Sequence, residues 1–261
     1  MSRPPPAGLR LGLDLGSTAA KAVLIDAGGA ILATRLDASG RPPDEVVADL
    51  LRGLPDGAGT AAVAATGYGR SLVGCAERKI TEITCHARGV GKLHPDARSI
   101  LDIGGQDAKA IRLGRDGGVE DFAMNDRCAA GTGRFLEMAA RRYGLEVAGL
   151  SEFCGHSPVQ GSKGAPWEIS STCVVFAESE LIGLNARGTP PIEALRAVHR
   201  SIARRVSLLL KQVGAAEPLY FTGGVAQNAA LAAAIGAECG MAIRVAERPQ
   251  FTGALGAALS A

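Results

Sequence analysis

Two cysteines stand in settings that suit thiolate chemistry. Cys128 lies in the small-residue stretch 125–133 (NDRCAAGTG), which leads directly into a helical run at 134–143. A helix start offers free backbone N–H groups and a positive dipole end, and both favour a thiolate. Cys173 follows a polar stretch of similar character, Ser170 to Thr172. Either cysteine alone would be interpreted as a small buried thiol. The two sulfurs are too few for a four-thiolate metal site, so such a site would have to be shared between two chains.

A second constellation occurs twice. Residues 14–23 (DLGSTAAKAV) and 102–111 (DIGGQDAKAI) align at a constant offset, with Asp, Gly, Ala, Lys and Ala coinciding. Each copy starts at the end of a predicted strand, and a Gly-Gly turn follows in both, at 28–29 and 117–118. The pattern predicts an internal duplication of a unit in which three strands are joined by two turns.

The duplicated turns have the composition of a phosphate site. A turn rich in Gly, Ser and Thr directs several N–H groups into one concavity that suits phosphate oxygens, and an aspartate at a strand end can hold Mg²⁺ through water. An accidental pair of β-turns is the alternative. The predicted phosphate contacts are Gly16, Ser17, Thr18, Gly104 and Gly105; Asp14 and Asp102 are the Mg²⁺-side carboxylates; Lys21 is a further phosphate contact or a surface lysine; and Gln106 and Asp107 are candidates to orient an attacking water.

A third glycine turn lies near the C-terminus. The predicted strand 219–221 ends in residues 222–228 (TGGVAQN), and a helix is expected at 229–238. Two glycines between a strand and a helix allow a flat ring or a phosphate to approach the backbone closely. Gly223, Gly224 and Asn228 are therefore candidate binding residues.

Composition limits the class of protein. The chain has 261 residues, with 47% hydrophobic and 4% aromatic residues and a net charge of +2. This length allows two compact domains, and the charge, without a basic stripe, favours neither nucleic acid nor an acidic membrane as a partner. No apolar leader or run of about 18 apolar residues is present, so a soluble, cytoplasmic protein is expected. The six cysteines show no disulfide-framework spacing.

Alternating and helical patterns predict an α/β chain. The polar segment 146–169 is expected to be a surface loop with Cys154 exposed, and His199 is expected to pack rather than to catalyse. Strands are predicted at 9–14, 20–26, 31–36, 60–65, 99–103, 219–221 and 242–246, and helices at 44–51, 82–93, 181–186, from 190 onward, 229–238 and 251–259.

These motifs resemble those of known families. The turns at 14–21, 102–107 and 221–225 resemble the first phosphate, second phosphate and adenosine motifs of the acetate kinase, sugar kinase, Hsp70 and actin superfamily. Within it, the cysteine stretches 125–133 and 169–180 resemble the ATP-dependent activators of 2-hydroxyacyl-CoA dehydratases and the ATPase subunits of benzoyl-CoA reductases. The likeness covers the chain from about Leu9 to Leu259, although the segment between the cysteines is longer here.

The resemblance implies a fold and a set of ligands. The fold would be the actin-like ATPase fold, an α/β fold with two duplicated RNase H-like domains around a nucleotide cleft. The domains would be 1–94 plus 246–261, and 95–245. ATP and Mg²⁺ would be bound, with Gly223, Gly224 and Asn228 at the adenosine end. Cys128 and Cys173 of each chain would hold one [4Fe-4S] cluster between the subunits of a homodimer.

The resemblance also implies a function, ATP-driven electron transfer. Ferredoxin or flavodoxin would be the donor, and the iron-sulfur component of a 2-hydroxyacyl-CoA dehydratase or a related reductase would be the acceptor. The ATPase subunit of a benzoyl-CoA reductase-type complex is the closest alternative. A small-molecule (sugar) kinase would use a carboxylate such as Asp107 but would leave the two cysteines unexplained. A non-redox reactivating scaffold is the third alternative, and the sequence does not name the acceptor.

Overall fold

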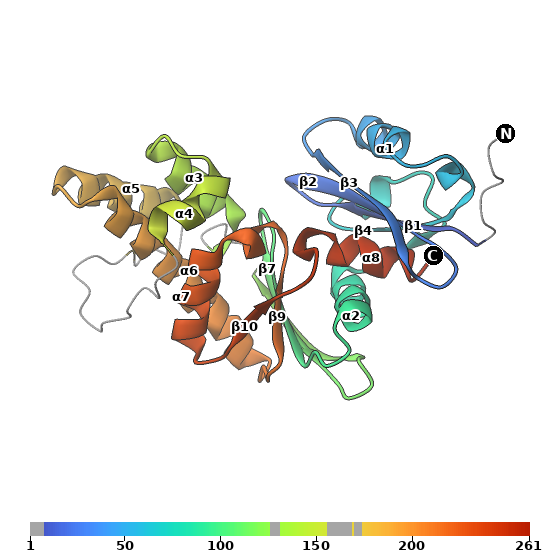
Figure 1. Ribbon diagram of the computed structural model, residues 1–261. Coiled ribbons are helices and arrows are strands. Elements are labelled where there is room, and N and C mark those ends of the chain that lie inside the picture. Colours follow the sequence, from blue (N-terminus) through green and yellow to red (C-terminus); the bar gives the residue numbers. More distant parts are fainter. Residues whose placement is uncertain (1–7, 126–130, 156–168, 170–173) are drawn as a thin grey trace. The chain divides into compact units, whose positions relative to one another are not determined.

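The computed structural model describes residues 8–125, 131–155, 169 and 174–261 (Figure 1). The chain divides into two compact units. The first unit comprises Met1–Asp96, Arg115–Val119 and Gln250–Ala261, and the second comprises Ala97–Gly114 and Glu120–Pro249. Within the described residues, no helix is both long enough and apolar enough to cross a membrane.

The first unit is built on a five-stranded sheet in the order β3-β2-β1-β4-β5. The central strand β1 pairs antiparallel with β2 and parallel with β4. The strands are β1 (Arg10–Leu15), β2 (Ala19–Ile25), β3 (Ile31–Ala38), β4 (Ala62–Thr66) and β5 (Arg78–Lys79), and the helices are α1 (Pro43–Arg52), α2 (Glu82–Leu93) and α8 (Thr252–Ala258).

Alternation along β1 decides which helix covers each face of this sheet. Leu11 and Leu13 are fully buried in one cluster with Leu50 of α1. Successive side chains of a strand alternate between its two faces, so a side chain at Gly12, between them, would face the other side of the sheet. A Cβ added at Gly12 would lie 1.9 Å from the carbonyl oxygen of Ala254. The glycine therefore lets the backbone of α8 pack directly on the strand.

The second unit contains a sheet in the order β10-β9-β6-β7-β8. Helices α3, α4, α5, α6 and α7 contribute to one large buried cluster with β6, β7 and β9. The strands are β6 (Ser99–Ile103), β7 (Ala108–Leu113), β8 (Val119–Asn125), β9 (Leu219–Thr222) and β10 (Ile243–Val245), and the helices are α3 (Gly133–Arg142), α4 (Leu150–Cys154), α5 (Val174–Ala186), α6 (Pro191–Gln212) and α7 (Ala229–Cys239).

The two sheets share one topology. In each, the first strand pairs antiparallel with the second and parallel with the fourth, β4 or β9. The repeated Asp and Lys occupy the same register, with Asp14 opposite Lys21 and Asp102 opposite Lys109. The predicted α/β duplication is confirmed, and the architecture is that of the actin-like ATPase fold.

Three local predictions were wrong. Part of the segment expected to be a surface loop forms α4, and Cys154 at its end is only 1% exposed. Leu150 and Cys154 lie four residues apart, so both face the core from one side of this short helix. The helix expected at 181–186 begins earlier, at Val174.

Candidate functional site

The first turn joins β1 to β2 and is braced from the end of β3. The backbone N–H of Ser39 donates to the carbonyl of Thr18 at 3.0 Å, and the Ser39 hydroxyl donates to the carbonyl of Gly16 at 2.7 Å. Ser17 is half-buried, and Thr18 is exposed. The sequence motif is therefore a fixed turn that presents Thr18 to solvent.

Asp14 and Lys21 meet beside this turn. Lys21 Nζ donates to Asp14 Oδ2 at 3.1 Å. A Cβ added at Gly253, near the start of α8, would lie 3.4 Å from Asp14 Oδ2 and 3.2 Å from Nε2 of His86. The carboxylate is thus enclosed on one side by its cross-strand lysine and on another by α8. In this structure Lys21 neutralises the aspartate, and a direct phosphate contact by Lys21 stays a prediction.

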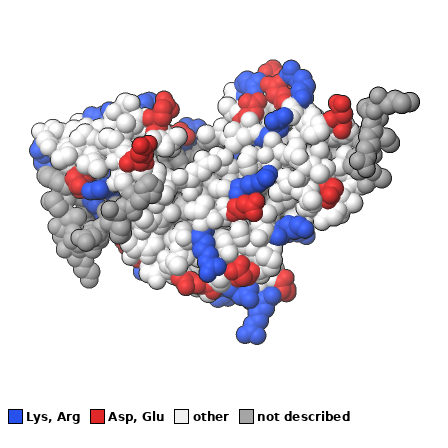
Figure 2. Space-filling model, in the orientation of Figure 1, with Lys and Arg blue, Asp and Glu red and all other residues white. Residues whose placement is uncertain are grey.

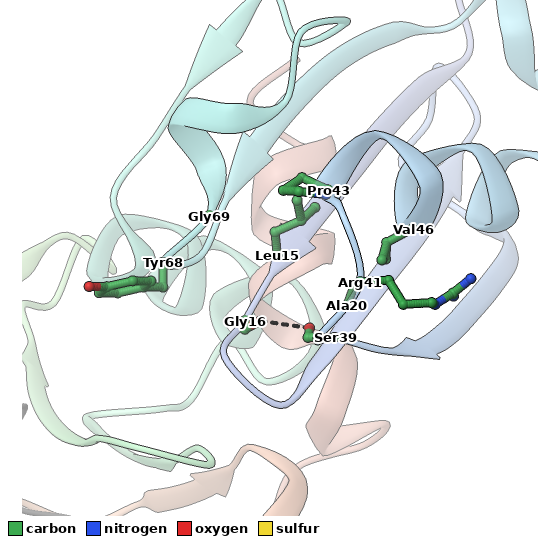
Figure 3. Close-up of a pocket in the computed structure, with 10 residues that line it drawn as sticks. Leu15, Gly16, Ala20, Ser39, Arg41, Pro43, Val46, Tyr68 and Gly69 are labelled. Carbon is green, nitrogen blue, oxygen red and sulfur yellow. Dashed lines mark hydrogen bonds between the residues drawn. The ribbon is translucent and has the colours of Figure 1, made fainter.

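A hollow of about 160 Å³ lies next to the first turn (Figure 3). Gly16 and Ser39 border it, and the dashed line between them marks the bracing hydrogen bond. Tyr68 reaches away from the other side chains in Figure 3 and is 82% exposed. The remaining lining residues are Leu15, Ala20, Gly40, Arg41, Pro43, Val46 and Gly69.

The second turn carries more charge than the first. Lys109 is 2% exposed, and its Nζ lies 2.7 Å from Asp107 Oδ2 and 3.6 Å from Asp102 Oδ2. Thr222, at the end of β9, donates its hydroxyl to Asp102 Oδ1 at 2.9 Å. The buried ammonium group of Lys109 therefore lies between the carboxylates of Asp102 and Asp107.

Sequence reasoning assigned no role to Lys109 or Thr222. The lysine could have been found from the repeat, since it occupies the position of Lys21 in the second copy. No local signal identifies Thr222 as the hydrogen-bond partner of Asp102, because that contact depends on β9 lying parallel to β6.

The third glycine turn lies against the second one. Gly223 has φ 88°, and a Cβ there would lie 2.2 Å from the carbonyl oxygen of Ile103 and 3.0 Å from Asp102 Oδ1. Only glycine combines this backbone conformation with such a close approach. Gly223 and Gly224 are thereby placed beside the second turn, with Gly224 exposed to solvent. Asn228 is 6% exposed, and its side chain makes hydrogen bonds inside the protein.

The start of α3 is fixed to the second turn. The N–H of Gly133 donates to the carbonyl of Gly104 at 2.9 Å, and the N–H of Arg134 donates to the carbonyl of Gly105 at 3.0 Å. The N–H groups of Gly133 and Arg134 are therefore not free, whereas the predicted thiolate at Cys128 lies outside the described residues and stays a prediction. The unpaired donors of a helix start require partners, and two of them find carbonyls of the glycine turn.

Gln106 adds a side-chain link between the same elements. With its amide oxygen facing Arg134, it accepts from Nη2 at 3.0 Å and from Nε at 3.2 Å. Gln106 and Arg134 are both exposed, and Asp107 is half-buried. The two residues expected to orient an attacking water are thus held in place, one by α3 and the other by Lys109.

Cys128 and Cys173 lie outside the described residues. The helices that follow them in sequence, α3 and α5, pack against each other. Phe135 of α3 and Leu181 of α5 share one buried cluster, and the hydroxyl of Tyr143 donates to Asn185 Oδ1 at 2.5 Å. Within the part of the chain that the structure describes, no three His, Cys, Asp or Glu side chains gather as a metal site.

The described cysteines are poor ligand candidates. Burial raises the pKa of Cys154 to about 11, and burial likewise raises the pKa of Cys85 to about 11. Both thiols are therefore protonated near neutral pH, whereas metal ligation requires the thiolate. Cys75 is exposed, and Cys239 is partly buried.

Charge on the visible surface is mixed. Basic and acidic side chains are interspersed over the face drawn in Figure 2 rather than separated by sign. This face agrees with the small net charge of +2.

The chain is similar to known proteins over nearly its whole length. The chain is 41% identical over 256 residues to the 2-hydroxyisocaproyl-CoA dehydratase activator of Clostridioides difficile, covering 96% of this chain and 94% of the relative. It is 36% identical to a benzoyl-CoA reductase subunit of Thauera aromatica, covering 95% and 91%. The solved structure of the activator of the 2-hydroxyisocaproyl-CoA dehydratase from Clostridium difficile with bound ADPNP superposes with a TM-score of 0.86 at 40% identity, covering 97% of this chain and 94% of that one.

The match to a protein family spans both units. Residues 11–261 match the family described as the BadF/BadG/BcrA/BcrD ATPase family, so all three glycine turns and both cysteine stretches fall inside it. With full-length relatives above 30% identity, the chain belongs to the BadF/BadG/BcrA/BcrD ATPase family.

Proposed function

We propose that this chain is an ATP-hydrolysing activator that transfers electrons to a 2-hydroxyacyl-CoA dehydratase or a related reductase. Cys128 and Cys173 of two copies would hold one [4Fe-4S] cluster, and ferredoxin or flavodoxin would supply the electron. The kinship with dehydratase activators supports an activator role. A role as the ATPase subunit of a benzoyl-CoA reductase-type complex is a variant of the same proposal.

The glycine turns suit a nucleotide. A Cβ at Gly16 would lie 2.9 Å from the carbonyl of Ala19, and one at Gly104 would lie 3.0 Å from Asp107 Oδ1. Both positions therefore favour glycine, so the turns present backbone without a side chain there. We propose that the two turns bind the phosphates of Mg-ATP, that Asp14 and Asp102 face the metal, and that Gly223 and Gly224 accept the adenosine end.

The anchoring of α3 carries the proposal. The same glycines that would hold phosphate accept the first two N–H groups of α3 from Gly133 and Arg134. Cys128 precedes this helix by a few residues in the sequence. A change of the turn on hydrolysis would therefore act directly on the helix that follows the cysteine. Two discrete arrangements of such an element are what nucleotide-dependent gating requires.

The cysteines explain why two copies would be needed. Cys128 and Cys173 would give two thiolates from each chain, and a [4Fe-4S] cluster requires four. When bound, the cluster supplies one-electron transfer. The chain's own contribution is to fix α3 and α5 against each other, through Phe135, Leu181 and the Tyr143–Asn185 hydrogen bond. We propose that this helix pair holds the two sulfurs of one chain in a defined geometry.

Iron content after purification without oxygen tests the cluster. Cys128→Ser and Cys173→Ser should each abolish iron binding and visible absorbance, while Cys75→Ser, at an exposed cysteine, should keep about four iron atoms per dimer. Circular dichroism and Mg-ADPNP binding verify that the variants are folded. Normal iron content in both variants would remove the cysteines from the proposal, and phosphate transfer to a sugar would favour a kinase instead.

A nucleotide effect on the cluster tests the coupling. Mg-ATP and Mg-ADP should change its EPR spectrum or midpoint potential by different amounts, because a ligand shifts a conformational equilibrium only through different affinities for the two states. Iron should also be chelated faster with Mg-ADPNP than without nucleotide. If the EPR spectrum, the midpoint potential and the chelation rate were all unchanged by nucleotide, the chain would be a scaffold that carries iron. Proteins that co-purify without oxygen would identify the acceptor.

A further inference from the structure

A buried chain of hydrogen bonds lies behind the third glycine turn. Asn228 ends this turn and caps α7, since its Oδ1 accepts from the backbone N–H of Leu231 at 3.0 Å. Its Nδ2 lies 3.0 Å from Nε2 of His199, and Nδ1 of the histidine lies 2.8 Å from the carbonyl oxygen of Leu195. His199 is fully buried, and Asn228 is 6% exposed.

The donor and the acceptor of each of these three hydrogen bonds are fixed. The carbonyl of Leu195 can only accept, so Nδ1 of His199 carries the hydrogen. Nε2 then presents a lone pair, which accepts from the amide group of Asn228. The amide oxygen of Asn228 is left to accept from Leu231, as the capping geometry requires. One tautomer of His199 and one orientation of Asn228 make these three hydrogen bonds together.

Protonation of His199 would disrupt this series of hydrogen bonds. A second N–H on the ring would face the amide N–H₂ of Asn228, and the amide could turn only by giving up its cap to Leu231. Burial lowers the pKa of His199, which keeps the ring neutral near neutral pH. The thiol of Cys154 lies 3.9 Å from Nδ1, and Arg196 donates to the carbonyl of Cys154 at 3.1 Å, so α4 closes this site from another side.

This series of hydrogen bonds includes Asn228, which directly follows the short helix Gly224–Gln227 of the third turn. Gly223 is held against Ile103 and Asp102 at the N-terminal end of the turn, and Asn228 holds its C-terminal end. Gly224, between these two supports, is the exposed residue of the pair of glycines. Gly224 thus lies between a residue packed against β6 and a residue hydrogen-bonded to α6.

We propose that His199 is a positioning residue for nucleotide binding, which holds the Gly223–Gly224 turn in its binding conformation through Asn228. This rests on the proposed function, in which these glycines contact the adenosine end of ATP. A histidine that merely fills the core would support the fold without selectively affecting nucleotide affinity. The two possibilities therefore separate in a binding measurement.

Binding of Mg-ADPNP to the full chain, measured by calorimetry, tests the proposal. His199→Leu removes the acceptor and should raise the Kd about tenfold, while kcat at saturating ATP should change by less than about twofold. His199→Gln can place an amide oxygen near the position of Nε2, and its Kd should stay within about threefold of the original chain. Rescue by glutamine is the readout that a packing role would not give.

Two further variants keep the test decisive. Asn228→Asp keeps the acceptor for Leu231 but cannot donate to His199, so it should also raise the Kd, even if His199→Leu fails to fold. Val206→Ala makes a cavity at another fully buried position of α6 and should leave the Kd unchanged.

The outcomes separate this proposal from the proposed function. If the unaltered chain binds no Mg-ADPNP, the nucleotide site and this proposal both fail. If it binds but Asn228→Asp and every folded His199 variant bind equally well, the positioning role alone is overturned. An equal loss of affinity in Val206→Ala, or no rescue by glutamine relative to leucine, would likewise assign His199 to packing.

Discussion

The first and second turns occupy equivalent positions in the two duplicated sheets, yet they are built differently. Beside the first, Lys21 pairs with Asp14, and the end of β3 braces the loop through Ser39. Beside the second, buried Lys109 contacts both Asp102 and Asp107. The residue equivalent to Asp107 in the first copy is Ala19. The two copies thus share the Asp and Lys positions of the turn, and only the second has a further carboxylate between them.

The second turn also supports a helix. Gly104 and Gly105 accept the first N–H groups of α3, whereas the carbonyl of Gly16 in the first turn accepts from the Ser39 hydroxyl. A turn braced within its own sheet can hold phosphate, but a turn bonded to a helix can also transmit its conformation. We therefore expect substitutions at the second turn to have larger and more varied effects than their counterparts at the first.

The largest difference is expected for the paired lysines. Lys109→Met removes the cation from between two carboxylates at a site where the lysine side chain is 3% exposed, and it should lower the free energy of unfolding by about 3–5 kcal/mol. Lys21→Met, where the lysine side chain is 17% exposed, should cost about 1–2 kcal/mol. Urea unfolding at pH 7 measures both. Equal costs, or the reverse order, would contradict the asymmetry.

The carboxylate of Asp107, which the first turn lacks, should affect the rate of ATP hydrolysis. Asp107→Asn should lower kcat for Mg-ATP hydrolysis by about 10–100-fold, because the amide no longer accepts the proton of an attacking water. The fold should persist, since an amide oxygen can still accept from Lys109. Ala19→Ser, at the equivalent position of the first turn, should change kcat by less than about twofold. A wild-type rate in Asp107→Asn would leave Gln106 as the candidate for orienting water.

Much of this comparison could be predicted from the sequence. The register of Asp and Lys follows from a local repeat, and a strand–turn–strand pattern with matching glycines determines which residues face each other. The partners of α3 could not be found in this way. A helix start predicts free N–H groups, but Gly104 and Gly105, which accept them, lie far away in the sequence. The local pattern therefore predicts the N–H donors at the start of α3 but not the carbonyl acceptors, which tertiary packing brings to them.

The segment between the cysteines illustrates the same limit. Its polarity predicted a loop, but Leu150 and Cys154 bury one side of α4 in the core of the second unit. Five residues are too few for a helical period to be recognised in the sequence, and tertiary packing stabilises the turn instead. The predictions for Cys128 and Cys173 fall on residues outside the described ranges and stay predictions.

The anchoring of α3 gives a smaller, more selective effect. A Cβ at Gly133 would lie 3.1 Å from the carbonyl oxygen of Gly104 and 3.2 Å from Cγ2 of Val225. Gly133→Ala should therefore loosen the helix from the turn and reduce the nucleotide effect on iron chelation about fivefold, with Mg-ATP hydrolysis retained. Gly149→Ala, with nothing within 4 Å of the added carbon, is the matched control. An undiminished nucleotide effect in Gly133→Ala would mean that the coupling takes another route.

The smallest expected effect is an acid sensitivity that originates in the second unit. Burial lowers the pKa of His199 in the folded chain below about 6.5, its value in an unfolded chain. As pH falls below about 6.5, His199 therefore binds a proton in the unfolded state but not in the folded state. The free energy of unfolding decreases with falling pH until the pKa of the folded state is reached. His199→Gln, which cannot titrate, should show a shallower decrease between pH 7.5 and pH 5. Urea unfolding of both proteins across this range measures the difference. Identical slopes would place the acid-sensitive group elsewhere and would leave the hydrogen-bond chain behind the third turn without a role in pH dependence.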